Sequence, residues 1–201
     1  MAPPTSATRR IARLASILIH PAAVMAFAAA VAAGAADHAS GMLWQSLGFT
    51  LAAIAVVMLY SARQARSGRW THIDASQRHE RSQLNRFASW LLLGLAAVLA
   101  IAGAHRGIIV AIGLAGLIVL AGHLLRGRLK SSLHVAFAVF AACLVWPHPM
   151  ACAGLLLAAA VVGWSRVVLG RHAISEVGVG AVLGALGGLS FQLATHAPAL
   201  A

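Results

Sequence analysis

The chain alternates long apolar runs with short polar segments, and this pattern predicts helices that cross a membrane. A bilayer core of about 30 Å requires roughly 20 apolar residues per helix. Seven runs approach this length, at 12–35, 41–62, 87–104, 107–125, 132–147, 150–169 and 174–195. We therefore expect an all-α fold, an integral membrane helical bundle with about six to seven transmembrane helices.

Two of the expected boundaries divide longer apolar regions. The third and fourth runs separate at 104–107, where Arg106 precedes Gly107, because a tight turn is less costly than an Arg buried in lipid. The fifth and sixth runs separate at 146–149, which contains two prolines and a Trp suited to the membrane interface.

The polar segments indicate one membrane-embedded domain over 1–201. It comprises two N-terminal spans within 1–62, a basic loop at 63–86, and the remaining spans with the main polar motifs within 87–201. The first run also fits a secretory signal, but its length and the span directly after it favour a retained helix.

Composition supports this interpretation and excludes other classes. The chain is 61% hydrophobic and 9% charged, whereas about a quarter of the residues in soluble domains carry charge. The two cysteines, Cys143 and Cys152, lie in or beside apolar runs and form no disulfide framework. The cations lie between apolar runs rather than on a hydrophilic face, so we expect the bilayer as partner and no nucleic acid. The oligomeric state is left open.

The distribution of cations predicts an orientation. Counting spans from the N-terminus, every Lys and Arg except Arg106 falls on one side, which the positive-inside rule assigns to the cytoplasm. The richness in Ala, Gly and Arg with a single Lys suggests a bacterial protein of the inner membrane.

One polar group lies where the last run begins. Glu176 follows His172 by four residues, so its carboxylate can accept a hydrogen bond from the His ring and fix its tautomer. Ser165, Arg166 and Arg171 precede this pair. The alternative is an interfacial Arg cluster with a capping His and Glu.

A second polar group precedes the fifth run and contains Lys130, Ser131, Ser132 and His134. Hydroxyl and N–H groups at a helix N-terminus favour a bound anion. Alternatively, Ser132 is an N-cap and His134 an interfacial side chain. The other histidines, His20 among them, lack the paired spacing of a metal site and receive no role.

Together these groups resemble the type 2 phosphatidic acid phosphatase superfamily of membrane lipid phosphatases, which is related to the vanadium haloperoxidases. Ser165, Arg166 and His172 match its third motif, Ser-Arg, five residues, His, three residues, Asp, with Glu176 in place of Asp. The second motif, Pro-Ser-Gly-His, resembles residues 131–134, where Ser and Leu replace Pro and Gly.

The first motif of that family, Lys, six residues, Arg-Pro, has a weaker counterpart. Arg81 and Ser82 stand for Arg-Pro, but the Lys position falls on Asp74, so Arg78 would supply the second cation. The alternative is a solvated basic loop in which Asp74 and Glu80 form surface ion pairs.

The resemblance implies a phosphatase that acts on a phosphomonoester or diphosphate of a lipid or polyprenyl substrate through a phosphohistidine. His172 would be the nucleophile, Glu176 its orienting partner and His134 the general acid. The resemblance implies that the phosphate oxygens are bound by Arg166, Ser132, Lys130, Arg81 and Arg78. It implies neither a metal nor a cofactor. The residue types agree, because fixed cations stabilise phosphoryl transfer.

One departure from the motifs leaves a rival interpretation open. Leu133 replaces a Gly that lets the backbone approach a ligand, and it is expected to crowd the phosphate or alter the loop. The rival is a non-catalytic membrane protein that keeps the pocket only to bind anionic lipid. Such a protein needs cations but has little use for an oriented His172 ring. A transporter is disfavoured because no span interior carries a charged pair.

Overall fold

The computed structural model describes residues 5–34, 39–73, 75, 77–127 and 129–196. In these ranges the chain forms eight α-helices and no strand. The helices are α1 (Ser6–Leu18), α2 (Pro21–Gly34), α3 (Ala39–Arg66), α4 (Arg78–Ile101), α5 (Arg106–Leu125), α6 (Leu133–Leu144), α7 (Pro149–Val168) and α8 (Ile174–His196).

Most of these helices are long and apolar enough to cross a membrane. Five qualify by length and composition, namely α3 from Trp44 onward, α4, α5, α7 and α8, and the bent pair α1 and α2 makes a sixth if counted as one span. The expected all-α bundle of membrane-spanning helices is therefore confirmed.

The first expected span, 12–35, is broken in the middle. The axes of α1 and α2 differ by 46°, and the break falls at Ile19 and His20. Pro21 explains it, because proline has no N–H to donate and disfavours helical backbone in the residue before it. The ring of His20 then caps α2, since its Nδ1 accepts a hydrogen bond from Ala22 N–H at 3.2 Å.

The basic loop expected at 63–86 is shorter than predicted, because α3 continues to Arg66 and α4 already begins at Arg78. Glu80 explains the early start. It is 1% exposed, and its carboxylate accepts hydrogen bonds from the N–H groups of Gln77 at 2.8 Å and Thr71 at 2.6 Å. The surface ion pair considered for Glu80 is therefore wrong, while Asp74 lies outside the described residues.

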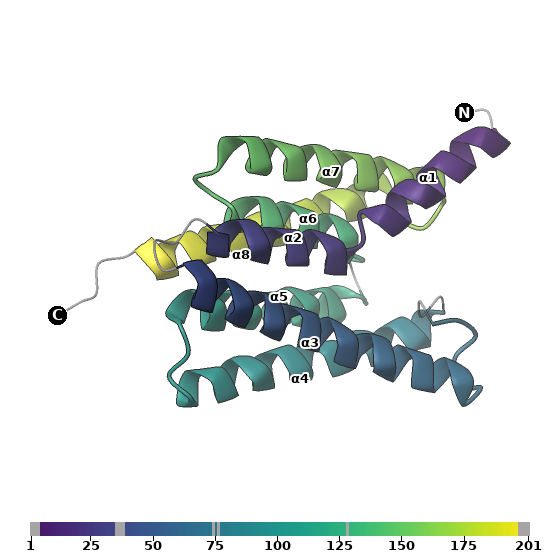
Figure 1. Cartoon of the computed structure of the whole chain (residues 1–201). Coiled ribbons are helices and arrows are strands. Elements are labelled where there is room, and N and C mark those ends of the chain that lie inside the picture. Colours follow the sequence, from purple (N-terminus) through teal and green to yellow (C-terminus); the bar gives the residue numbers. More distant parts are fainter. Residues whose placement is uncertain (1–4, 35–38, 74, 76, 128, 197–201) are drawn as a thin grey trace.

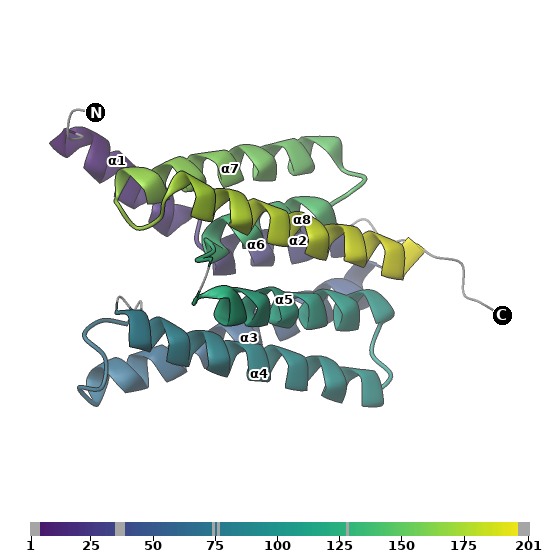
Figure 2. The ribbon, with the colours of Figure 1, turned by 180° about the vertical axis from the view of Figure 1, so that it is seen from behind.

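The short helix α6 occupies the middle of the bundle. Its 12 residues are too few to cross a bilayer core, and most of its side chains are buried against α2, α7 and α8. Figures 1 and 2 show α6 between α2 and α8, with α3, α4 and α5 forming the other half of the molecule.

Glycines let α8 approach α6 closely. A Cβ atom on Gly180 would stand 2.5 Å from the carbonyl oxygen of Ser132, and one on Gly184 would stand 2.3 Å from that of Ala136. Both distances are shorter than any Cβ tolerates, so only glycine permits this backbone contact. The contact holds the beginning of α6 against the beginning of α8.

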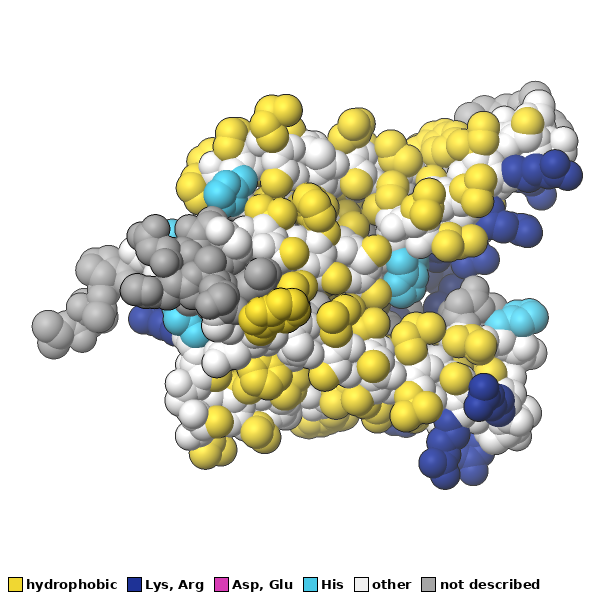
Figure 3. Space-filling view, viewed as in Figure 1, with side chains coloured by type: hydrophobic (Ala, Val, Ile, Leu, Met, Phe, Trp, Pro, Cys, Tyr) yellow, Lys and Arg dark blue, Asp and Glu magenta, His cyan; other side chains and the backbone are white. Residues whose placement is uncertain are grey.

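The connections α3–α4, α5–α6 and α7–α8 all lie at one end of the bundle, which we call the cationic end (Figure 1). Lys and Arg side chains gather over this end in the space-filling view (Figure 3). The two polar groups identified in the sequence, at the beginnings of α6 and α8, therefore share one end of the molecule.

Candidate functional site

The core of the candidate site is the contact between His172 and Glu176. Helix α7 ends at Val168, the chain turns at Gly170 with a φ of 65°, and His172 lies in this turn before α8. Its Nδ1 is 2.9 Å from Glu176 Oε2. A carboxylate only accepts hydrogen bonds, so Nδ1 carries the proton and the lone pair of Nε2 remains available. The expected hydrogen bond between these two residues is present.

Glu176 has two further contacts. Its Oε2 accepts a hydrogen bond from Ala173 N–H at 3.3 Å, as an acidic residue in the first turn of a helix commonly does. Its Oε1 is 3.8 Å from Lys130 Nζ. Lys130 thus lies beside the carboxylate, and its own side chain is 59% exposed.

Arg166 is a buried cation behind His172. It lies in the last turn of α7, is 6% exposed, and its Nη1 donates to Ser16 Oγ at 3.0 Å. Its carbonyl oxygen accepts hydrogen bonds from the N–H groups of Arg171 at 2.9 Å and His172 at 3.2 Å. The backbone of the loop that carries His172 is therefore hydrogen-bonded to Arg166, whose side chain is the buried cation.

The beginning of α6 faces this loop. Ser132 N–H donates to the carbonyl oxygen of Glu176 at 3.0 Å, and Ala136 N–H makes the first helical hydrogen bond, to Ser132. The amide of Ser132 is therefore occupied, whereas those of Leu133, His134 and Val135 precede that first bond. Unpaired amides at a helix N-terminus favour an anion. The Ser132 hydroxyl is buried and has no hydrogen-bond partner among the described residues.

His134 connects the two groups. It lies within electrostatic range of Arg166, Arg171, His172 and His20. The rings of His134 and His20 meet edge to face, with their centroids 5.4 Å apart. A general acid at position 134 would therefore stand close to the nucleophile and the cations.

The structure separates the two candidates for the first motif. Arg81 lies in the first turns of α4, within electrostatic range of His172. Arg78 instead points toward α5, and its Nη2 lies 3.5 Å from the carbonyl oxygen of Arg126. Arg81 is thus the residue that the fold brings to the site, whereas the hydrogen bond of Arg78 goes to the end of α5.

The side chain of Leu133 does not point toward the expected phosphate position. A Cβ atom on Gly122 of α5 would lie 3.0 Å from Leu133 Cδ2, so the Leu side chain packs against α5. The predicted crowding of the phosphate is therefore not seen, because the helix direction at 133 sends this side chain into the apolar core.

Burial lowers the pKa of His172 below its ordinary value. The hydrogen bond that Nδ1 donates to Glu176 opposes this shift, and the charge of Arg166 adds to it. The net direction is downward, so the ring is neutral near pH 7, as a nitrogen nucleophile requires.

Two residues of the site were not predicted from the sequence. Ser16, which contacts Arg166, and His20, which contacts His134, both belong to the N-terminal segment, and His20 had been given no role. The one local signal was a His followed by Pro21 inside an apolar run, which marks a helix break but names no partner.

No group of three or more His, Cys, Asp or Glu side chains in the described part of the chain is placed to hold a metal ion. No family model, curated protein or solved structure matches this chain.

Proposed function

We propose that this protein is a membrane phosphatase that hydrolyses a phosphomonoester or diphosphate of a lipid or polyprenyl substrate through a phosphohistidine. The single observation that carries the proposal is the 2.9 Å contact between His172 Nδ1 and Glu176 Oε2, made at the cationic end of an apolar bundle. A His ring held in one tautomer beside fixed cations suits nucleophilic attack on phosphorus.

In the first step, the lone pair of His172 Nε2 attacks the phosphorus atom. The bond from phosphorus to the leaving oxygen breaks, and His134 donates a proton to that oxygen. Burial and the neighbouring cations hold the pKa of His134 well below its ordinary value, so this role requires the negative charge of the bound phosphate to raise it again. Arg166 and Arg81 neutralise charge on the phosphoryl oxygens, where electrostatic stabilisation contributes most to this class of reaction.

In the second step, water attacks the phosphorus atom of the phosphohistidine. The now neutral His134 removes a proton from the water, the P–N bond breaks, and inorganic phosphate leaves. Glu176 holds the His172 ring throughout and stabilises its positive charge while the ring is phosphorylated. The cycle ends with both histidines in their starting states, and these steps call on no cofactor.

The rival is a non-catalytic protein that binds anionic lipid at the same cations. The deciding experiment measures phosphate release by the detergent-purified protein from lipid phosphates and polyprenyl diphosphates, with His172→Ala as control. We expect release that falls at least about 1000-fold in the variant, as when a catalytic nucleophile is removed. Anionic-lipid binding by folded protein without any release would favour the rival.

We further propose that the site, which lies at the cationic end, faces the cytoplasm, as the positive-inside rule favours, and that the membrane is the inner membrane of a bacterium.

A further inference from the structure

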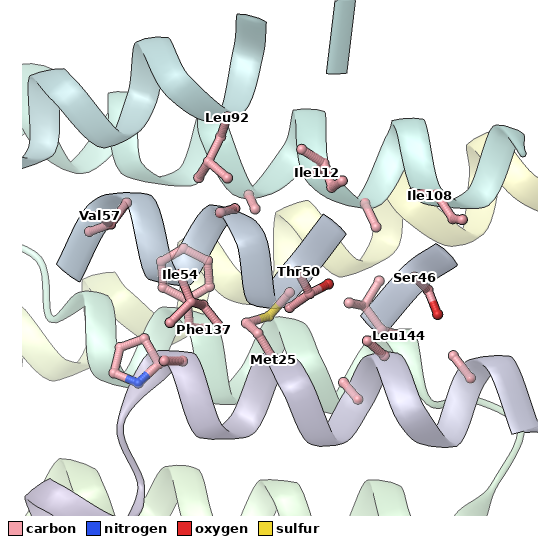
Figure 4. Close-up of a pocket in the computed structure, with 18 of the residues that line it drawn as sticks. Met25, Ser46, Thr50, Ile54, Val57, Leu92, Ile108, Ile112, Phe137 and Leu144 are labelled. Carbon is pink, nitrogen blue, oxygen red and sulfur yellow. The ribbon is translucent and has the colours of Figure 1, made fainter. Parts of the chain in front are cut away.

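An apolar cavity of about 330 Å³ lies inside the bundle, next to the candidate site. It is lined by α2, α3, α4, α5 and α6, with a contribution from α8, and is partly open; its polar lining side chains are His20, Ser46, Thr50 and His105. Figure 4 shows lining side chains directed into this space, among them Met25, Ile54, Leu92, Ile112 and Phe137. Cavities with such linings hold little water and favour apolar ligands.

The cavity runs along the helices rather than across them. On α2 the lining residues extend from Pro21 to Ala32, which is about 17 Å at the helical rise per residue. This length resembles the depth of one bilayer leaflet, about 15 Å of the roughly 30 Å hydrocarbon core. The space is therefore about as deep as the hydrocarbon chain of a membrane lipid.

His20 joins the cavity to the site. It lines the end of the cavity nearest the cationic end, and its ring meets that of His134 at 5.4 Å between centroids. In the proposed reaction His134 protonates the leaving oxygen, which is the atom that bears the rest of the substrate. The group attached to this oxygen would thus begin beside His20, at the mouth of the cavity.

We propose that this cavity binds a single hydrocarbon chain of the phosphorylated substrate, with His20 at its mouth. The inference rests on the proposed function, because that function places the phosphate at His172 and the leaving oxygen at His134. It narrows the substrate to an amphiphile whose chain enters the protein, in contrast to one whose chains all remain in the surrounding bilayer.

The first test fills the cavity. Ala111 and Ala53 line it from α5 and α3, whereas Ala97 on α4 is exposed and does not line it. The variants Ala111→Phe and Ala53→Phe are compared with Ala97→Phe as matched control, using hexadecyl phosphate and butyl phosphate as substrates. Thermal unfolding in detergent identifies any variant that is misfolded, and the second cavity variant then takes its place.

We expect kcat/KM for hexadecyl phosphate to fall at least about tenfold in the cavity variants, since displacing two methylenes from an apolar site already has that effect. The value for butyl phosphate and both values for Ala97→Phe should stay near those of the unchanged protein. Equal losses for the long and short substrates, or no loss for either, would overturn the proposal.

A second test reads binding without turnover. Hexadecyl phosphate with a terminal diazirine is cross-linked to the His172→Ala protein, and the labelled peptides are identified by mass spectrometry. Labels on α2 and α5 peptides, lost in Ala111→Phe, support the proposal. Labels confined to lipid-facing residues, or equal labelling by a diazirine hexadecanol without phosphate, would overturn it. Failure of the proposed function alone would appear differently, as correct labelling with no phosphate release by the unchanged protein.

Discussion

The side chain of Glu176 is held by His172, Ala173 and Lys130, which fix both of its oxygens. A carboxylate held this way orients a ring without touching the substrate. Its effect should therefore fall on turnover, because a misplaced nucleophile slows the chemical step while the cations still bind phosphate.

We predict that Glu176→Gln lowers kcat at least about 100-fold, as a 1 Å misplacement of a reacting group does, while KM changes by less than about threefold. The amide fits the same space but carries no negative charge, so it no longer stabilises the positively charged ring of the phosphohistidine. Steady-state kinetics with a hydrolysed lipid phosphate measure both values. Glu176→Asp is the matched control, since it keeps the charge, and we expect it to retain more activity. Proportional changes in kcat and KM would argue against an orienting role.

The lowered pKa of His172 predicts a pH dependence. A His whose pKa lies below its ordinary value stays neutral, and so nucleophilic, at a lower pH than an exposed His. We expect the acid limb of kcat/KM to lie below about pH 6.5, the ordinary His value. The pH profile between 4.5 and 8 measures it, with circular dichroism to confirm folding at each pH. An acid limb at or above 6.5 would contradict the prediction.

Among the elements, the contact of α6 with α8 positions the site, because it sets the beginning of one helix against that of the other. The two helices contact each other there through backbone atoms, at Gly180 and Ser132. Backbone contacts of this kind cannot relax by changing a rotamer, so the separation of the two helices is sensitive to a single methyl group.

We predict that Gly180→Ala destabilises the protein by about 1–3 kcal/mol, the usual range for overpacking, and lowers phosphate release by displacing the beginning of α6. Gly178→Ala is the matched control on the same helix, since its Cβ would meet nothing within 4 Å, and a change within about 0.5 kcal/mol is expected. Thermal unfolding in detergent and activity measure the two effects. Identical behaviour of the two variants would show that this contact does not constrain the site.

For the whole molecule, the uneven distribution of cations has a consequence for insertion. They crowd the end that carries the site (Figure 3). Arg106 begins α5 directly after the α4–α5 turn, which lies at the opposite end of the bundle (Figure 1). The same charges would serve both to hold phosphate and to retain this end in the cytoplasm.

We predict that Ser67→Cys, at the cationic end, is protected from a membrane-impermeant maleimide in intact cells, on a Cys143→Ala, Cys152→Ala background. Ala102→Cys, in the turn at the opposite end, is the control and should react readily. Both positions are exposed. If the cysteine at position 67 reacts readily before the cells are permeabilised, the cationic end faces outward and the predicted orientation is wrong.

The features that follow from local sequence could be predicted. The apolar runs predicted the helices, and the turns expected at 104–107 and 146–149 fall beside the beginnings of α5 and α7. The hydrogen bond between His172 and Glu176 was expected too, although His172 lies in the turn before α8, so the bond joins this turn to the first turn of the helix. Pro21 also lies in the sequence of the first expected span, but the helix break that it causes was not predicted.

Only the packing of the helices decided the rest of the site. Arg166 meets Ser16 across 150 residues of chain, and His20 meets His134 from a segment with no chemical motif. Arg81 rather than Arg78 approaches His172, and Leu133 turns toward α5. Each of these contacts depends on the rotation of one helix about its axis and on its distance from another. Local periodicity specifies which face is apolar but not which helix that face will meet.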